Sequence, residues 1–191
     1  LGNDDWMVRK AAADVLARRG DTSAVPALRE VLRDAYWPVR CSAARALGLL
    51  GDRTAAPTLR DALKDESVAV RSAAATALGR LRDAPSAPLL MDRLDDKDLV
   101  RLAAIRALGA LRDATAAPDL RAALKDGDGV VRCAAAGALG RLGDRAALAG
   151  VMDDDNWLVR RAVLDALGRM GDREALFAGL QDVQPAIRRR A

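Results

Sequence analysis

The stretch from residue 34 to residue 52 reads DAYWPVRCSAARALGLLGD, and variants of it recur along the whole chain. Its most regular feature is a Val-Arg pair, Val39-Arg40 in this copy. The pair returns every 28 to 31 residues, at Val8, Val70, Val100, Val131 and Val159, and as Ile187-Arg188 in a variant form. Because seven copies keep one register, the sequence predicts a repeat protein rather than a single compact core.

Each copy predicts one amphipathic helix that begins near its Val-Arg pair. From Val39, small or apolar residues follow at helical spacing, at Ala43, Ala46, Leu47 and Leu50. Polar residues three places before the valine are expected to cap the helix, namely Asp5, Ser67, Asp128 and Asn156. Glycines at the other end are expected in the left-handed C-cap conformation, namely Gly20, Gly51, Gly143 and Gly171.

A second, shorter helix is predicted after each first one, as in TAAPTLRDALKD at residues 54–65. A proline suits the first turn of a helix, and prolines stand there at Pro26, Pro57, Pro88 and Pro118. Thr54, Ser86 and Thr115 are expected to cap these helices. The last two copies lack the proline and are shorter. Each repeat is therefore predicted to be a helical hairpin of about 30 residues.

The composition favours helices and limits the chemistry. Hydrophobic residues make up 51% of the chain and aromatic residues only 3%, so alanine, leucine and valine supply the core and let helices approach closely. Histidine is absent, and two cysteines are too few for a disulfide framework. We therefore predict a non-catalytic protein with no metal and no cofactor. Without a signal peptide or a membrane-spanning run, we expect a cytoplasmic protein that does not bind membranes.

The shared pattern D-x-x-x-x-V-R-x-x-A-A-x-A-L-G-x-L-G-D resembles the HEAT-like repeats named after phycobilisome lyases, over essentially the whole chain. The resemblance implies an all-α fold, a right-handed α-solenoid of about six stacked helical hairpins whose Val-Arg helices line the concave side. It also implies that each Val-Arg arginine pairs with a recurring aspartate between helices. These aspartates lie five places before the valines, at Asp34, Asp65, Asp95, Asp126, Asp154 and Asp182. We expect residues 1–191 to form one such solenoid, part of a longer array because neither end carries a polar cap.

The positions that vary between copies carry the functional prediction. Residues two before, two after and six after each valine are expected on one exposed stripe of the concave face. The predicted partner-binding residues are Trp6, Lys10, Trp37, Cys41, Arg45, Ser72, Leu102, Arg106, Cys133, Trp157 and Arg161. Tryptophan and arginine are enriched at binding hot spots, so a protein or peptide partner is predicted. Each tryptophan could instead fold over its own helix as a packing plug, and the sequence leaves both interpretations open.

Other candidate sites have simpler structural interpretations. Cys41 and Cys133 share one repeat position three repeats apart, too far for a disulfide in a regular solenoid. The acidic runs at 153–156 and 95–98 lack calcium-loop spacing and are expected to complement helix N-termini. The basic run of Arg188, Arg189 and Arg190 is expected to begin a truncated helix.

The resulting prediction is a scaffold that binds a protein or peptide on its concave face. The resemblance supplies an alternative, a bilin lyase or chaperone-type subunit. A second alternative is a nucleic-acid-binding solenoid, which the modest net charge of +4 disfavours. The uncapped ends also leave end-to-end self-association open.

Overall fold

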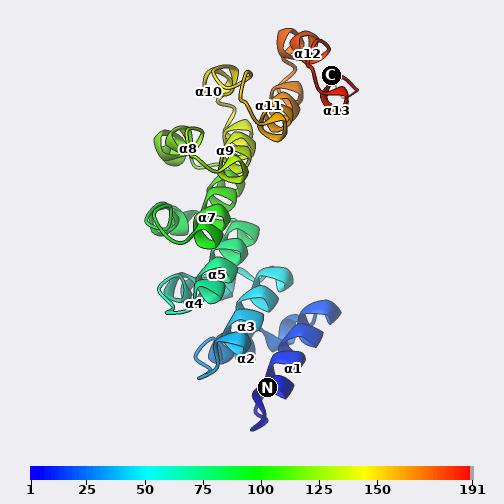
Figure 1. Ribbon diagram of the computed structural model, residues 1–191. Coiled ribbons are helices and arrows are strands. Elements are labelled where there is room, and N and C mark those ends of the chain that lie inside the picture. The colour runs from blue at the N-terminus through cyan, green and yellow to red at the C-terminus, as the bar shows by residue number, and fades with distance from the viewer. Residues whose placement is uncertain (190–191) are drawn as a thin grey trace. The chain divides into compact units, whose positions relative to one another are not determined.

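The computed structural model describes residues 1–189, which divide into two compact units. The boundary in the chain falls between Ala107 and Leu108. Within the described residues every regular element is a helix (Figure 1), so the predicted all-α class is confirmed. No helix in this part of the chain is long and apolar enough to cross a membrane. The prediction of one continuous domain over 1–191 stays a prediction, and Arg190 of the terminal basic run lies outside the described residues.

The first unit is built from helical hairpins in two layers. In chain order its helices are α1 (Trp6–Arg19), α2 (Val25–Val31), α3 (Trp37–Leu50), α4 (Ala56–Ala62), α5 (Val68–Leu81), α6 (Ala87–Met91) and most of α7 (Asp98–Leu111). A short 3-10 turn precedes each of α2, α4 and α6. The helices α1, α3 and α5 pack side by side, while α2 packs against α3 and α4 against α5 (Figure 1). Stacked hairpins of this kind define an α-solenoid.

The second unit repeats the same plan. It contains the end of α7 and then α8 (Ala117–Ala123), α9 (Gly129–Leu142), α10 (Arg145–Ala149), α11 (Trp157–Arg169), α12 (Arg173–Gly179) and α13 (Pro185–Arg188). Here α9 packs on α11, with α8 against α9 and α12 against α11. The second helices α10 and α12 begin without the proline and the 3-10 turn of the earlier copies, as their shorter sequences predict.

The core consists of the repeated apolar positions. From the second copy onward the anchor valines are buried, as are the leucines eight places later, from Leu47 to Leu167. Glycines nine places after the valine allow the first helices of consecutive hairpins to touch. A Cβ atom on Gly48 would lie 2.7 Å from the Ala77 Cα, and one on Gly140 would lie 2.6 Å from the Ala166 Cβ. The close packing expected from small side chains is therefore confirmed.

Helix ends follow most of the predicted signals. The side chains of Asp5, Asp128 and Asn156 accept a hydrogen bond from the backbone N–H two residues later, whereas Ser67 begins α5 without such a bond. The four C-terminal glycines all have positive φ angles, between 68° and 83°. Where the sequence reads LRD instead of LGD, Arg82 and Arg112 adopt the same left-handed conformation, which an L-residue with a side chain does at some cost.

The predicted caps of the second helices are wrong. The preceding aspartates instead cap the 3-10 turns before α4 and α8: Asp52 accepts from the Thr54 N–H at 2.8 Å, and Asp113 from the Thr115 N–H at 2.9 Å. Ser86 does not cap a helix, and its hydroxyl donates to the Asp83 carbonyl oxygen at 2.6 Å. The reason is the short 3-10 turn before each helix, which moves the first unpaired N–H groups upstream.

Candidate partner-binding surface

The most repeated polar contact is the bond from each Val-Arg arginine to an aspartate of the next hairpin. Arg40 donates from Nε and Nη2 to the two carboxylate oxygens of Asp65, at 2.7 and 2.9 Å. Its Nη1 donates to the carbonyl oxygens of Asp34 and Ala35. Both side chains are nearly buried, 9% and 11% exposed. This two-pronged geometry is the strongest form of an arginine–carboxylate pair, so it fixes one turn between helices to the next.

The same bond recurs four more times within the two units, and we call the set the Arg-Asp ladder. Its other pairs join at 2.6 to 3.0 Å and are Arg9–Asp34, Arg71–Asp96, Arg132–Asp154 and Arg160–Asp182. One predicted member is wrong, because Arg71 binds Asp96 and not Asp95. In that hairpin the aspartate lies four places before the valine, one fewer than in the other copies.

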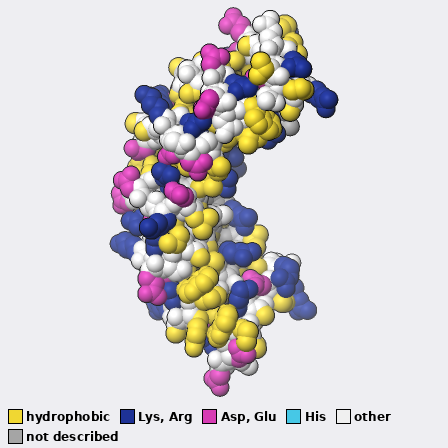
Figure 2. Space-filling view, in the orientation of Figure 1, with side chains coloured by type: hydrophobic (Ala, Val, Ile, Leu, Met, Phe, Trp, Pro, Cys, Tyr) yellow, Lys and Arg dark blue, Asp and Glu magenta, His cyan; other side chains and the backbone are white. Residues whose placement is uncertain are grey.

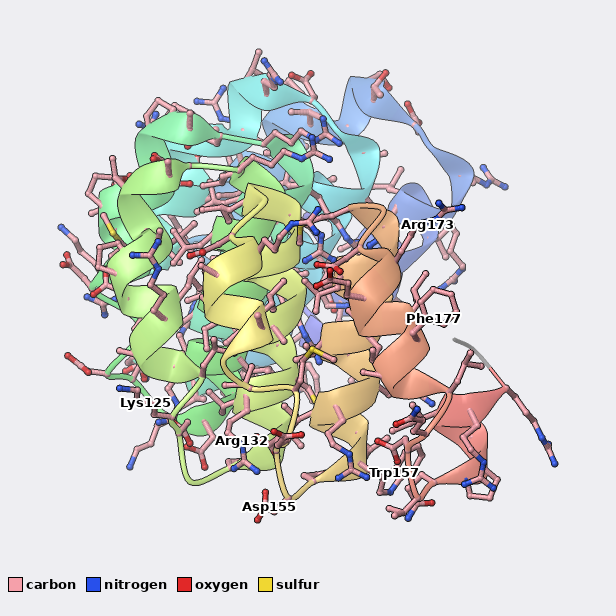
Figure 3. All side chains as sticks on the ribbon, turned by 90° about the horizontal axis from the view of Figure 1, so that it is seen from above. Lys125, Arg132, Asp155, Trp157, Arg173 and Phe177 are labelled. Atoms are coloured by element: carbon pink, nitrogen blue, oxygen red, sulfur yellow. The ribbon has the colours of Figure 1, made fainter. Side chains whose placement is uncertain are left out.

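The charged groups of the ladder are bonded to one another within the folded structure. Hydrogen bonds from the arginines hold the pKa of each of their partners Asp34, Asp96, Asp154 and Asp182 below its usual value. Arg132 also binds Asp155 at 2.7 Å, and the two side chains point toward one another in Figure 3. Arginines held in this way are not available to phosphate groups, which counts against a nucleic-acid surface along the ladder.

A groove of about 530 Å³ lies on the first helices of the first unit, between α3, α5 and the start of α7. It is lined by Cys41, Arg45, Leu49, Ala69, Ser72, Ala73, Thr76, Ala77, Arg80 and Leu99. Three predicted binding residues, Cys41, Arg45 and Ser72, therefore meet in one depression. The Cys41 thiol contacts the Ala69 carbonyl oxygen at 3.6 Å, and the Ser72 hydroxyl donates to the Leu99 carbonyl oxygen at 3.2 Å.

Two leucines of this groove were not predicted from the sequence. Leu49 and Leu99 are 54% and 55% exposed, which is unusual for leucines beside so regular a core. They occupy the repeat positions ten after and one before the anchor valine. At 100° per residue, these positions and the one six after the valine fall within about 40° on the helix surface. A helical-wheel comparison of the repeats places them on the same side of the helix as Arg45, but it does not show that neighbouring helices leave this side open.

The three tryptophans are not among the side chains that line this groove. Trp6 is half-buried and stacks on Tyr36, with ring centroids 5.9 Å apart and planes at 16°. Trp37 is 51% exposed, and Figure 2 shows apolar side chains gathered over the N-terminal parts of α1 and α3. Trp157 is half-buried at the start of α11 (Figure 3), with the Arg161 guanidinium 5.5 Å from its ring centre.

The remaining predicted residues take separate positions on the first helices. Lys10 forms an ion pair with Asp14 at 2.8 Å on α1. On α7, Leu102 is half-buried and Arg106 is exposed. Cys133 lies half-buried on α9 in the second unit. Each of these residues lies on a first helix, and their arrangement as one exposed stripe stays a prediction.

Sequence comparison agrees with this architecture. A family model described as HEAT repeats matches residues 1–40, 26–104 and 95–153, which together exceed half of the chain. The chain belongs to the HEAT-repeat family. A second model, described as the PBS lyase HEAT-like repeat, matches residues 159–176 of this HEAT-repeat chain. No curated protein sequence matches it significantly.

Solved structures of similar fold include a lyase subunit. A chain from the complex of CpcE and CpcF of phycocyanin lyase from Nostoc sp. PCC7120 is 32% identical, with a TM-score of 0.74. That alignment covers 92% of the HEAT-repeat chain and 77% of the lyase chain. YibA from E. coli is 26% identical with a TM-score of 0.67, over 95% and 73% of the two chains. An engineered protein that shares the fold is 23% identical with a TM-score of 0.68, over 90% and 93%.

The reactive groups of the HEAT-repeat chain are few. Burial raises the pKa of both thiols, Cys41 and Cys133, so each is a protonated, weak nucleophile near neutral pH. Among the described residues, no group of three or more cysteine or acidic side chains could hold a metal ion. The surface features that remain are shape, exposed apolar side chains and exposed arginines.

Proposed function

We propose that this HEAT-repeat chain is a non-catalytic scaffold that binds a protein partner on the face formed by the first helices of its hairpins. The observation that carries the proposal is the groove between α3, α5 and α7, where Leu49 and Leu99 are exposed. Neither leucine belongs to the repeated core, so the fold itself does not require them. Exposed apolar side chains that line a depression are typical of an interaction site.

The other predicted residues supply candidate contacts on the first helices of each unit. In the first unit we assign supporting contacts to Trp37, Leu102 and Arg106. In the second unit we assign them to Trp157 and Arg161, whose stacked pair joins an aromatic ring to a guanidinium. Trp6 is better explained as a packing residue, because it stacks on Tyr36 of the next hairpin.

The test compares capture by three forms of the full chain from an extract of the source organism. The groove variant is Arg45→Glu with Leu99→Asp. The matched control is Arg33→Glu with Arg53→Glu, two exposed arginines at the second helices and their turns. We expect a protein that wild type and control retain and the groove variant loses, with equal helicity in all three by circular dichroism. A partner retained equally by all three forms would contradict this site.

A second candidate function is that of a subunit of a bilin lyase, favoured by the 32% identity to a chain of the phycocyanin lyase complex. Under this proposal the same face would hold a linear tetrapyrrole or the protein that receives it. The raised pKa of the Cys41 and Cys133 thiols argues against a covalent link to this chain. Mixing the chain with a free bilin should change the visible absorption spectrum if it binds the chromophore. An unchanged spectrum would rule out chromophore binding.

A further inference from the structure

Two arginines of the groove form no ion pair with an acidic side chain in the described part of the chain. Arg45 and Arg80 line the groove and are exposed, and neither forms a hydrogen bond or ion pair there. The positive charge of Arg45 acts on the carboxylate of Asp14, but that carboxylate is already bonded to Lys10 at 2.8 Å. The ladder arginines, by contrast, are each bonded to an aspartate. The groove therefore carries uncompensated positive charge beside its apolar surface.

Much of the groove's lining is apolar. Ala69, Ala73 and Ala77 of α5 line it together with Ser72 and Thr76, and Leu49 and Leu99 come from α3 and α7. Packed helices lie roughly 8–10 Å apart, so α3 and α7 are separated by roughly 20 Å across α5. An extended chain advances about 3.3 Å per residue, so a segment of about six residues can cross the groove.

We infer that the groove binds an acidic peptide segment that also carries apolar side chains. Carboxylates of the segment pair with Arg45 and Arg80, and its apolar side chains lie on the alanines between the two leucines. Arginine suits this task because its planar donors match a carboxylate. This inference rests on the proposed scaffold function and names the chemistry of its partner.

A protein segment fits these features better than a nucleic acid does. Single strands are bound by several cations along the backbone and by aromatic rings that stack on the bases. The groove offers two arginines, and its lining contains no aromatic side chain. Its alanine methyl groups instead suit leucine-sized side chains.

The experiment selects random peptides of about a dozen residues by phage display on the immobilised full chain. Wild type should enrich peptides with acidic residues next to leucine, isoleucine or phenylalanine. A synthetic copy of one such peptide should bind the double variant Arg45→Glu, Arg80→Glu about thirtyfold more weakly than it binds wild type. The reason is that two charged, hydrogen-bonded contacts become repulsive. Selection on that charge-reversed variant should yield basic peptides. The control Arg33→Glu with Arg53→Glu should select the same peptides as wild type.

The outcomes separate this inference from the proposed function. The selected peptides could fail to bind the Leu99→Asp variant, yet show no enrichment in acidic residues and still bind the charge-reversed variant. That result would overturn the inference of an acidic partner but support the proposed scaffold function. If neither the selected peptides nor any captured protein needs Leu99 for binding, both the acidic-peptide inference and the proposed scaffold function are overturned. An oligonucleotide that displaces the selected peptides at equal concentration would also overturn the inference. If the charge-reversed variant does not fold, Arg45→Gln with Arg80→Gln tests the same loss with neutral side chains.

Discussion

At the scale of single residues, the same side-chain type has two distinct roles in this HEAT-repeat chain. Arg40 is nearly buried and makes bonds to the Asp65 carboxylate and to two backbone carbonyl oxygens. Arg45, five residues later on the same helix, is exposed and forms no ion pair among the described residues. Position on the helix decides the difference, because Arg40 faces the next turn while Arg45 faces the groove.

Removing a ladder arginine should destabilise the protein strongly. Arg40→Ala leaves the Asp65 carboxylate and two carbonyl oxygens without their main donor, at a site only about one-tenth exposed. We expect a loss of about 3 kcal/mol in the free energy of unfolding, because an uncompensated charge stays partly buried. Urea unfolding followed by circular dichroism measures it. The control Arg33→Ala removes a long, exposed pair with Glu30 and should change stability by less than about 0.5 kcal/mol.

The ladder also predicts acid sensitivity. The arginines lower the pKa of Asp34, Asp96, Asp154 and Asp182, so below the usual Asp value of about 3.9 the unfolded chain binds more protons than the folded one. Stability is therefore fully present above that value and is lost as the pH falls through the lowered folded values. Urea midpoints measured from about pH 7 to about pH 2 should be level at first and then fall steeply. Asp34→Asn should be less stable near neutrality but fall less in acid. A wild-type midpoint that rises below about pH 4 would contradict the ladder's role.

At the scale of helices, the spacing between hairpins depends on glycine. Gly48 lies against Ala77 of the next first helix, and an added Cβ would come within 2.7 Å of its Cα and Cβ atoms. Both neighbours are rigid, so α3 and α5 would have to separate. Small residues at this position thus set how closely the hairpins stack.

Gly48→Ala should therefore destabilise the chain although alanine favours helix. The overpacking cost is about 1–3 kcal/mol, against a helix-propensity gain of about 1 kcal/mol. We expect a lower urea midpoint for this variant. Gly127→Ala is the matched control, because nothing lies within 4 Å of its added Cβ, and it should leave the midpoint unchanged. Equal midpoints for Gly48→Ala and wild type would show that the helices can move apart freely.

Helices and their core faces could be predicted from the sequence, because the repeat supplies several copies of one pattern. Features that depend on the exact path of a turn could not. The segment before Val100 is one residue shorter than in the other copies, so Asp96 and not Asp95 pairs with Arg71. A 3-10 turn precedes α4, so Asp52 and not Thr54 is the capping residue. The groove was found in part, through Cys41, Arg45 and Ser72. Leu49 and Leu99 were missed because helical spacing does not say which exposed side of a helix its neighbours leave open.

At the scale of the whole molecule, stability in a repeat protein comes from contacts between neighbouring hairpins. Within each unit, the first helices pack against those of neighbouring hairpins, and the pairs of the Arg-Asp ladder join one hairpin to the next. Such a molecule need not unfold in one step, because one unit can lose structure while the other keeps it. Residues 1–107 and the residues from Leu108 onward form the two units in which this behaviour is expected.

A core substitution in one unit should therefore expose mainly that unit. Leu139 of α9 and Leu47 of α3 are equivalent and fully buried, and Leu→Ala at either should cost about 2–5 kcal/mol locally. With Leu139→Ala, hydrogen exchange read by mass spectrometry should show faster exchange in α9, α10 and α11 and wild-type protection in α1 and α3. Leu47→Ala should give the reverse pattern, which makes each variant the control for the other. Uniform loss of protection in both variants would mean that the two units unfold as one cooperative body, because local stability then could not differ between them.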